Sequence, residues 1–81
     1  MKFGDADFVA RVAFKAMGEL SGLVGLIKEC TDDDKEYEHY RDVLTGVFQQ
    51  MSQEFFKRIY DEHPEIEAKF GEYIEEFGRL P

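Results

Sequence analysis

Apolar residues recur every three or four positions along most of the chain, the spacing typical of amphipathic α-helices. Asp5 and Asp7 suit the positive start of a helix dipole, and Lys28 suits its negative end. We therefore predict a first helix over about residues 5–29. At ~100° per residue, its apolar stripe comprises Val9, Val12, Ala13, Ala16, Met17, Leu20, Leu23, Val24 and Ile27.

A second periodic segment follows, and we predict a helix over about residues 32–61. Thr31 is expected to cap it, with Asp34 three residues later in the place of a reciprocal capping acid. Phe56 and Tyr60 lie off the apolar stripe, which indicates a second neighbour along the carboxyl half. The stripe itself comprises Tyr37, Tyr40, Leu44, Val47, Phe48, Met51, Phe55 and Ile59.

The pair His63–Pro64 interrupts the pattern, because proline suits the first turn of a helix and disfavours helical geometry before it. A shorter third helix is predicted over about residues 64–77, with Gly78 as its stop. Its apolar face comprises Ile66, Phe70, Tyr73, Ile74 and Phe77. The fold class is therefore all-α. Residues 1–81 should form one domain, an antiparallel hairpin of two long helices plus a shorter C-terminal helix, as in a three-helix bundle.

The helix lengths do not match, since at 1.5 Å per residue the second is ~45 Å long and the third only ~20 Å. The third helix should cover only the half of the hairpin that holds Phe48 to Ile59 and the early part of the first helix. The apolar stripe near the turn then lacks cover, so we expect a partner or a second copy there. The predicted interface comprises Phe14, Gly18, Gly22, Leu23, Gly25, Leu26, Ile27, Tyr37 and Tyr40.

Three of these residues, Gly18, Gly22 and Gly25, line one side of the first helix roughly opposite its apolar stripe. Together they cost the helix on the order of 2–3 kcal/mol relative to alanine. Either the helix kinks or breaks there, which would make four helices, or the glycines permit close approach of another helix. The two interpretations are compatible.

The 81 residues include 18 acids and 10 bases, a net charge of −8. Residues 2–30 are balanced, whereas residues 31–63 carry nine acids against four bases, and residues 64–81 carry five against two. Acids at a helix start and on the surface aid the dipole and solubility. They would also steer the protein onto a basic surface. The predicted partner-facing acids are Asp32, Asp33, Asp34, Glu36, Glu38, Glu65, Glu72, Glu75 and Glu76.

Little in the sequence indicates catalysis. Glu36 and His39 form a single Glu-x-x-His pair, half of a di-iron pattern that needs a second pair. Asp32, Asp34 and Glu36 alternate as in a calcium loop, but the required glycine and the bidentate Glu are missing. Cys30 lies at a helix carboxyl end among acids, where a thiolate is disfavoured. We therefore expect no enzyme, no cofactor and no metal, with a carboxylate metalloenzyme as a remote alternative.

Direct nucleic-acid binding is also disfavoured, because the only adjacent cations, Lys57 and Arg58, lie among acids. The single cysteine, the lack of a signal-peptide pattern and the short apolar runs predict a cytoplasmic protein that does not enter membranes.

The leading hypothesis is a non-catalytic acidic protein that forms a homodimer and inhibits a basic partner protein, with nucleic-acid-binding proteins among the candidate partners. In size and charge alone the chain resembles small acidic helical inhibitors, such as phage anti-defence (anti-CRISPR) proteins and toxin-immunity proteins. The alternative is a structural assembly subunit or chaperone-like module that binds a partner helix through its apolar stripe.

Overall fold

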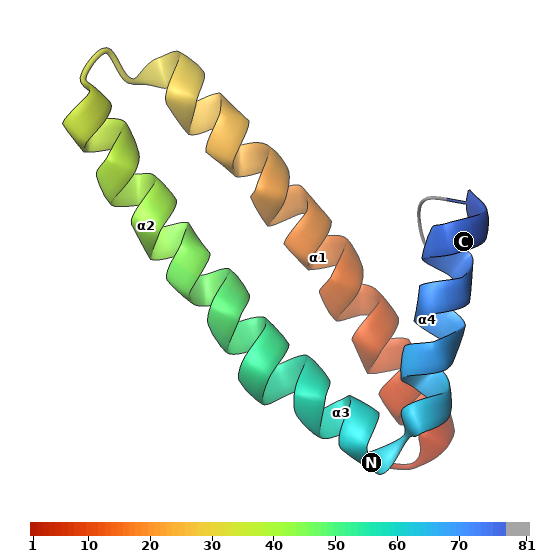
Figure 1. Cartoon of the computed structure of the whole chain (residues 1–81). Coiled ribbons are helices and arrows are strands. Elements are labelled where there is room, and N and C mark those ends of the chain that lie inside the picture. The colour runs from red at the N-terminus through yellow and green to blue at the C-terminus, as the bar shows by residue number, and fades with distance from the viewer. Residues whose placement is uncertain (78–81) are drawn as a thin grey trace.

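The computed structural model describes residues 1–77, except for the side chain of Phe77, and within them it is all-α. Helix α1 (Phe3–Cys30) is followed by α2 (Asp34–Gln50), the π-helical segment η1 (Met51–Phe56), α3 (Lys57–Glu62) and α4 (Pro64–Phe77). Segments α2, η1 and α3 form one continuous arm antiparallel to α1, and α4 is the shorter C-terminal helix (Figure 1). The predicted hairpin and third helix are confirmed. The proposed stop at Gly78 and the side chain of Phe77 lie outside the described residues.

Helix α1 runs unbroken from Phe3 to Cys30, through Gly18, Gly22 and Gly25. The alternative in which the first helix breaks at its glycines, making a fourth helix, is therefore wrong. Helices within proteins draw most of their stability from tertiary packing of an apolar face rather than from helix propensity. Contact between α1 and α2 on the opposite side of the helix holds these weak helix formers in place.

The turn between the two arms is built differently from the prediction. Thr31 does not cap α2; its hydroxyl donates a 2.9 Å hydrogen bond back to the carbonyl oxygen of Ile27 and so closes the end of α1. The N-cap of α2 is Asp33, whose carboxylate accepts a 3.0 Å hydrogen bond from the backbone N–H of Lys35. Because α2 begins at Asp34 and not earlier, the cap falls to Asp33, the residue directly before it.

The second arm contains a π-helical stretch that the sequence analysis did not predict. In it, the backbone N–H of Lys57 bonds to the carbonyl of Ser52, five residues earlier. Apolar residues here recur every four positions, a spacing that drifts ~40° around an α-helix at each step. The wider π turn reduces that drift. Met51, Phe55 and Ile59 can thus stay on one side of the arm while Phe56 and Tyr60 stay on another.

The buried core lies at the end of the hairpin away from the turn, where α1, α3 and α4 meet (Figure 1). It consists of Ala6, Ala10, Phe56, Ile59, Ile66 and Phe70. Tyr60 packs against this cluster, and its ring centroid lies 6.4 Å from that of Phe70 in α4. The second neighbour predicted from the off-stripe positions of Phe56 and Tyr60 is therefore confirmed as α4.

An ion-pair cluster joins α4 to α1 beside the core. The guanidinium of Arg11 donates a 3.0 Å hydrogen bond to Asp7, and the ammonium of Lys69 in α4 lies 4.0 Å from the other oxygen of that carboxylate. The hydrogen bond to Asp7 raises the pKa of Arg11. The Arg11 guanidinium also lies 5.4 Å from the ring centroid of Tyr73 and 5.7 Å from that of Phe70. Charge as well as packing thus holds α4 against α1.

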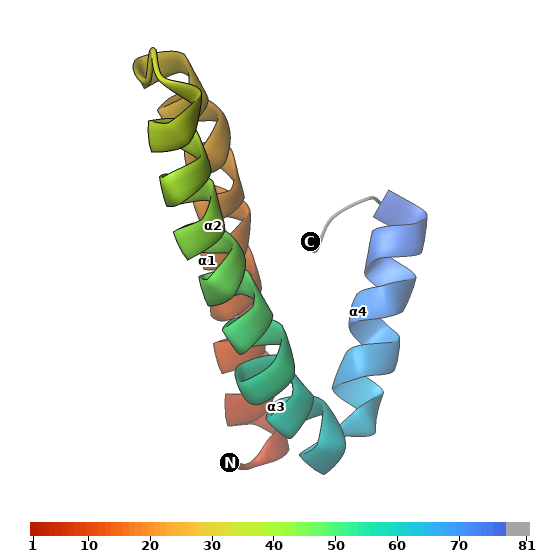
Figure 2. The ribbon, with the colours of Figure 1, turned by 60° about the vertical axis from the view of Figure 1, so that its left-hand side comes forward.

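Beyond these contacts α4 diverges from the hairpin, so that the two arms and α4 form an open V (Figure 2). Ile66 and Phe70 in the first half of α4 are buried, whereas Ile74 is 42% exposed. The prediction that the third helix covers the hairpin as far as Phe48 is wrong. The buried side chains of α4 all come from its first half, so its second half moves away from the hairpin.

Replacement of Ile66, which is fully buried, tests whether this small core holds the fold. We expect Ile66→Ala to lower the free energy of unfolding by ~2–4 kcal/mol, because it removes buried methyl groups and leaves a cavity. The matched change Ile74→Ala in the same helix should cost ~1 kcal/mol or less, because that side chain is half in water. Urea unfolding followed by circular dichroism measures both; equal losses would contradict the proposed core.

Candidate functional site

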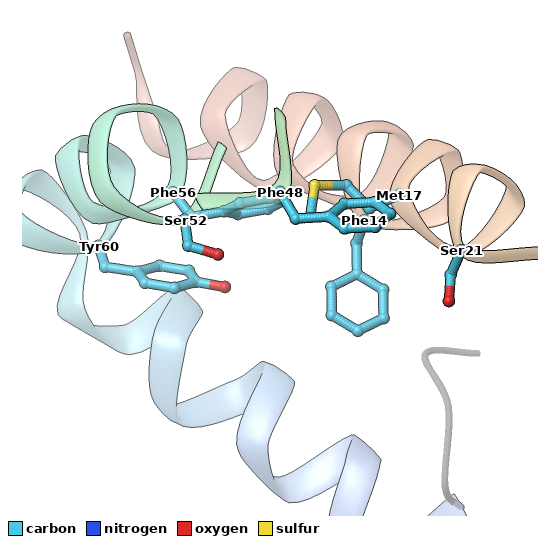
Figure 3. Close-up of a pocket in the computed structure, with 8 residues that line it drawn as sticks. Phe14, Met17, Ser21, Phe48, Ser52, Phe56 and Tyr60 are labelled. Carbon is cyan, nitrogen blue, oxygen red and sulfur yellow. The ribbon is translucent and has the colours of Figure 1, made fainter. Parts of the chain in front are cut away.

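An apolar pocket of about 470 Å³ opens between α1 and the second arm, on the side of the hairpin that faces α4 (Figure 3). One wall comes from α1 and the other from the second arm. The ring of Phe14 and the hydroxyls of Ser52 and Tyr60 point into the same space. The lining residues are Phe14, Met17, Gly18, Ser21, Phe48, Ser52, Phe56 and Tyr60. All eight residues lie on the hairpin, and the described part of α4 leaves this opening uncovered.

Aromatic contacts fix the closed end of this pocket. The rings of Phe14 and Phe70 meet edge to face with centroids 6.1 Å apart, and Phe56 lies 5.9 Å from Tyr60. Because the edge-to-face contact with Phe70 holds the Phe14 ring in a defined orientation, this wall of the pocket is preformed. An apolar segment with small polar groups would match this lining of rings and hydroxyls.

Among the described residues that line the pocket, Tyr60 is the only titratable one. Burial raises the pKa of its hydroxyl, and the nearby negative charge of Glu67 raises it further. The phenol therefore stays neutral at physiological pH and serves as a hydrogen-bond donor and acceptor rather than as a base. The chemistry of the pocket suits binding.

The glycine strip, formed by Gly18, Gly22 and Gly25, borders this opening. It is not packed against another helix within residues 1–77. A Cβ atom built at Gly18, Gly22 or Gly25 would meet nothing within 4 Å. Close helix packing at the strip is thus not made within the described residues. The interpretation that the glycines permit close approach now applies only to another molecule.

The nine residues predicted as one interface fall into different places. Phe14 and Gly18 line the pocket, whereas Ile27 and Tyr37 are half-buried. Leu23, Leu26 and Tyr40 are 37%, 54% and 46% exposed. Phe14 and Leu23 are ~180° apart around α1 at ~100° per residue, so these residues do not form a single surface.

A second apolar surface, here called the outer face, lies on the side of the hairpin away from the pocket. Its α1 residues are ~120–180° around the helix from Phe14. Phe8 and Val43 are 68% and 54% exposed. The sequence analysis missed them because it considered only the apolar stripe that faces the neighbouring helix, and these residues lie beside that stripe. The outer face consists of Phe8, Val12, Leu23 and Leu26 of α1 and Tyr40, Val43 and Val47 of α2.

The nine predicted partner-facing acids are all exposed. None of the ion pairs within residues 1–77 involves any of them. They form two groups, one at the hairpin turn and one on α4, which Figure 1 shows well apart. Glu72, Glu75 and Glu76 line a shallow hollow of about 370 Å³ on α4. Their charge is thus not neutralised by neighbouring cations.

Other candidate chemistry finds no assembled site in the described part of the chain. Cys30 and His39 are exposed, and the His39 ring lies edge-on to that of Tyr40, 5.4 Å away. Residues 1–77 hold no group of three or more His, Cys, Asp or Glu placed to bind a metal ion. No helix within them is both long enough and apolar enough to cross a membrane.

Comparison with protein-family models, with curated proteins and with solved structures gave no match.

Replacing the glycines of the strip by alanine tests their role. We expect Gly18→Ala, Gly22→Ala and Gly25→Ala each to raise the free energy of unfolding by ~0.5–1 kcal/mol, because alanine favours the helix and its Cβ meets no neighbour. Gly46→Ala in α2, where a Cβ also finds open space, is the matched control and should gain as much. Urea unfolding gives the values; a loss of stability at the strip alone would mean that it is packed within the chain.

Proposed function

We propose that this chain is a non-catalytic protein-binding protein that docks on a basic surface of a partner protein. The observation that carries the proposal is the set of nine exposed acids without a cation partner in residues 1–77. Unpaired like charges on a small rigid scaffold create a field that speeds association with a basic surface and disfavours acidic partners.

The pocket supports the non-catalytic part of the proposal. Its lining offers rings, a thioether and hydroxyls, and Tyr60 is kept neutral. General acid–base catalysis needs a group whose pKa lies near the working pH. This lining supplies no such group.

Such binding would make the protein an antagonist. Proteins that bind nucleic acids do so through clustered Lys and Arg. An acidic helical rod seated on such a cluster would exclude the nucleic acid by occupying the same charges. The rod measures 45 × 26 × 17 Å within the described residues, a size that suits a cleft.

Neutralising the acidic hollow of α4 tests the proposal. The partner is first recovered from the native source on immobilised wild-type protein. We expect the triple change Glu72→Gln, Glu75→Gln and Glu76→Gln to weaken its binding by roughly tenfold at low salt, since exposed charge pairs contribute ~0.2–1 kcal/mol each. Calorimetry at low and high salt measures the effect; binding that ignores salt would contradict the proposal.

A matched control separates the acidic surface from net charge. Asp42→Asn, Asp61→Asn and Glu62→Gln together change the charge by the same amount, but each of these carboxylates already lies within 4.0 Å of a cation. We expect this variant to bind nearly as well as the wild type. Equal weakening in both triple variants would show that only net charge matters.

A second candidate function, a structural module that holds a partner helix, is favoured by the open pocket on the side of the hairpin that faces α4. A helix of the partner would place apolar side chains against Phe14 and Phe48. The bare surface of Gly18 would let its backbone approach closely. The binding energy would then come from the rings and not from the acids.

Filling the pocket distinguishes the two functions. We expect Gly18→Leu, whose side chain enters the opening, to abolish binding of a partner helix by occupying its place. The control Gly46→Leu adds the same side chain at a glycine of α2 that does not line the pocket. Under the proposed electrostatic function neither change affects affinity, and only the loss of acids does. The same calorimetry reads both outcomes.

A further inference from the structure

The outer face of the hairpin is an apolar surface that the described residues 1–77 leave uncovered. Four of its side chains come from α1, where Phe8 is 68%, Val12 54%, Leu23 37% and Leu26 54% exposed. Tyr40, Val43 and Val47 of α2 are also exposed. These α2 residues lie ~80° or more around their helix from the pocket-lining Phe48. Exposed apolar side chains gathered on one face in this number indicate an interaction site.

Charge limits what can cover this face. Residues 2–30 carry four cations and four anions, whereas the rest of the chain is strongly negative. Two copies of a chain with a net charge of −8 repel each other on most approaches. They repel least when α1 meets α1, because this helix segment is balanced. The outer face therefore lies on the part of the chain best suited to a second copy.

The residues of this stripe on α1 are arranged symmetrically about position 17. Lys15 and Glu19 lie at equal distances before and after position 17, as do Val12 and Gly22 (next to Leu23), and Phe8 and Leu26. All lie within ~100° of one another around the helix. A two-fold symmetric contact requires this property, because residue i of one copy meets residue j of the other and j meets i.

An antiparallel pairing of two α1 helices uses each of these matches. Phe8 of one copy packs on Leu26 of the second, Val12 enters the space left by Gly22, and Lys15 meets Glu19 with opposite charge. Neither Lys15 nor Glu19 takes part in any ion pair within residues 1–77. In a parallel pairing Lys15 would face Lys15, and Glu19 would face Glu19.

We propose that the protein forms a two-fold symmetric homodimer through its outer face, with the α1 helices antiparallel and crossing near residue 17. The contact from Phe8 to Leu26 is ~27 Å long at 1.5 Å per residue. The like-charged Asp5 and Glu29 fall beyond its ends, where crossing helices diverge. The pocket and the acids of α4 stay outside the contact.

The mass in solution tests this dimer. Sedimentation equilibrium of the full chain should give about 19 kDa, twice the 9.5 kDa of one copy, at micromolar concentration. Leu26→Asp should raise the dissociation constant by roughly a hundredfold or more, because symmetry removes the side chain from both copies. The control Ile74→Asp, at an exposed position on α4, should leave it unchanged. A wild-type monomer at all concentrations would overturn the proposal.

A charge exchange tests the pairing itself. Lys15→Glu or Glu19→Lys alone should each weaken the dimer several-fold, and the double exchange should restore it. Circular dichroism of each variant at low concentration checks that the helices of the monomer are intact. If the double exchange stays as weak as the single changes, Lys15 does not face Glu19 and the proposed register is wrong.

Disulfide trapping tests the antiparallel orientation. The two copies of Cys30 would lie ~39 Å apart, at 1.5 Å per residue, so oxidation of the wild type should give no specific covalent dimer. Val12 faces Gly22 inside the proposed contact, so Val12→Cys together with Gly22→Cys, in a Cys30→Ser background, should cross-link readily. Efficient Cys30-to-Cys30 cross-linking in the wild type would overturn the antiparallel dimer and place the contact at the hairpin turn.

Discussion

The packing of Ile66 and Phe70 on Ala6 and Ala10 is the contact on which the rest of the structure depends. Both alanines are fully buried. Because an alanine side chain ends at Cβ, the larger side chains of η1, α3 and α4 in the same cluster can pack over these two positions. All fully buried apolar side chains of the described chain lie in this one corner. The remaining length of the hairpin is held by two-helix contact alone, which leaves apolar surface on both of its sides.

The two apolar surfaces differ in what borders them. The pocket side carries the glycine strip, the hydroxyls of Ser52 and Tyr60, and the opening beside α4. The outer face carries larger aliphatic and aromatic side chains and the unpaired Lys15 and Glu19. Small residues with a concave wall suit a narrow segment, whereas a flat aliphatic stripe with internal symmetry suits a copy of itself. One hairpin thus presents two surfaces of different chemistry.

Local signals predicted the elements well and their arrangement less well. The proline and the stripe from Ile66 onward located α4 at residues 64–77, as observed. The π-helical stretch could not be read from a pattern scored only against the α-helical repeat, although the four-residue spacing of Met51, Phe55 and Ile59 was its signal. Thr31 was misassigned because its hydroxyl had two possible partners, and local sequence does not decide between them.

The extent of the interface was harder to predict, because it depends on how α4 leaves the core. Helix lengths indicated that the turn end lacks cover, but not that α4 diverges before it reaches Phe48. The last contacts that hold α4 to α1, those of Arg11 and Asp7 with Lys69 and Tyr73, involve residues far apart in the sequence, so periodicity does not indicate where they end. The nine residues predicted as one interface lie instead on different sides of the hairpin.

Charge and apolar surface together determine how the proposed dimer would act. With the outer faces hidden, the acids of α4 and the open pocket of both copies stay accessible, on opposite sides of the two-fold axis. A partner that carries two basic sites, or a symmetric partner, would then be bound twice. The second binding event becomes intramolecular and raises the overall affinity without any new contact. A protein whose single acidic surface binds weakly and in a salt-dependent way can in this manner hold its target firmly.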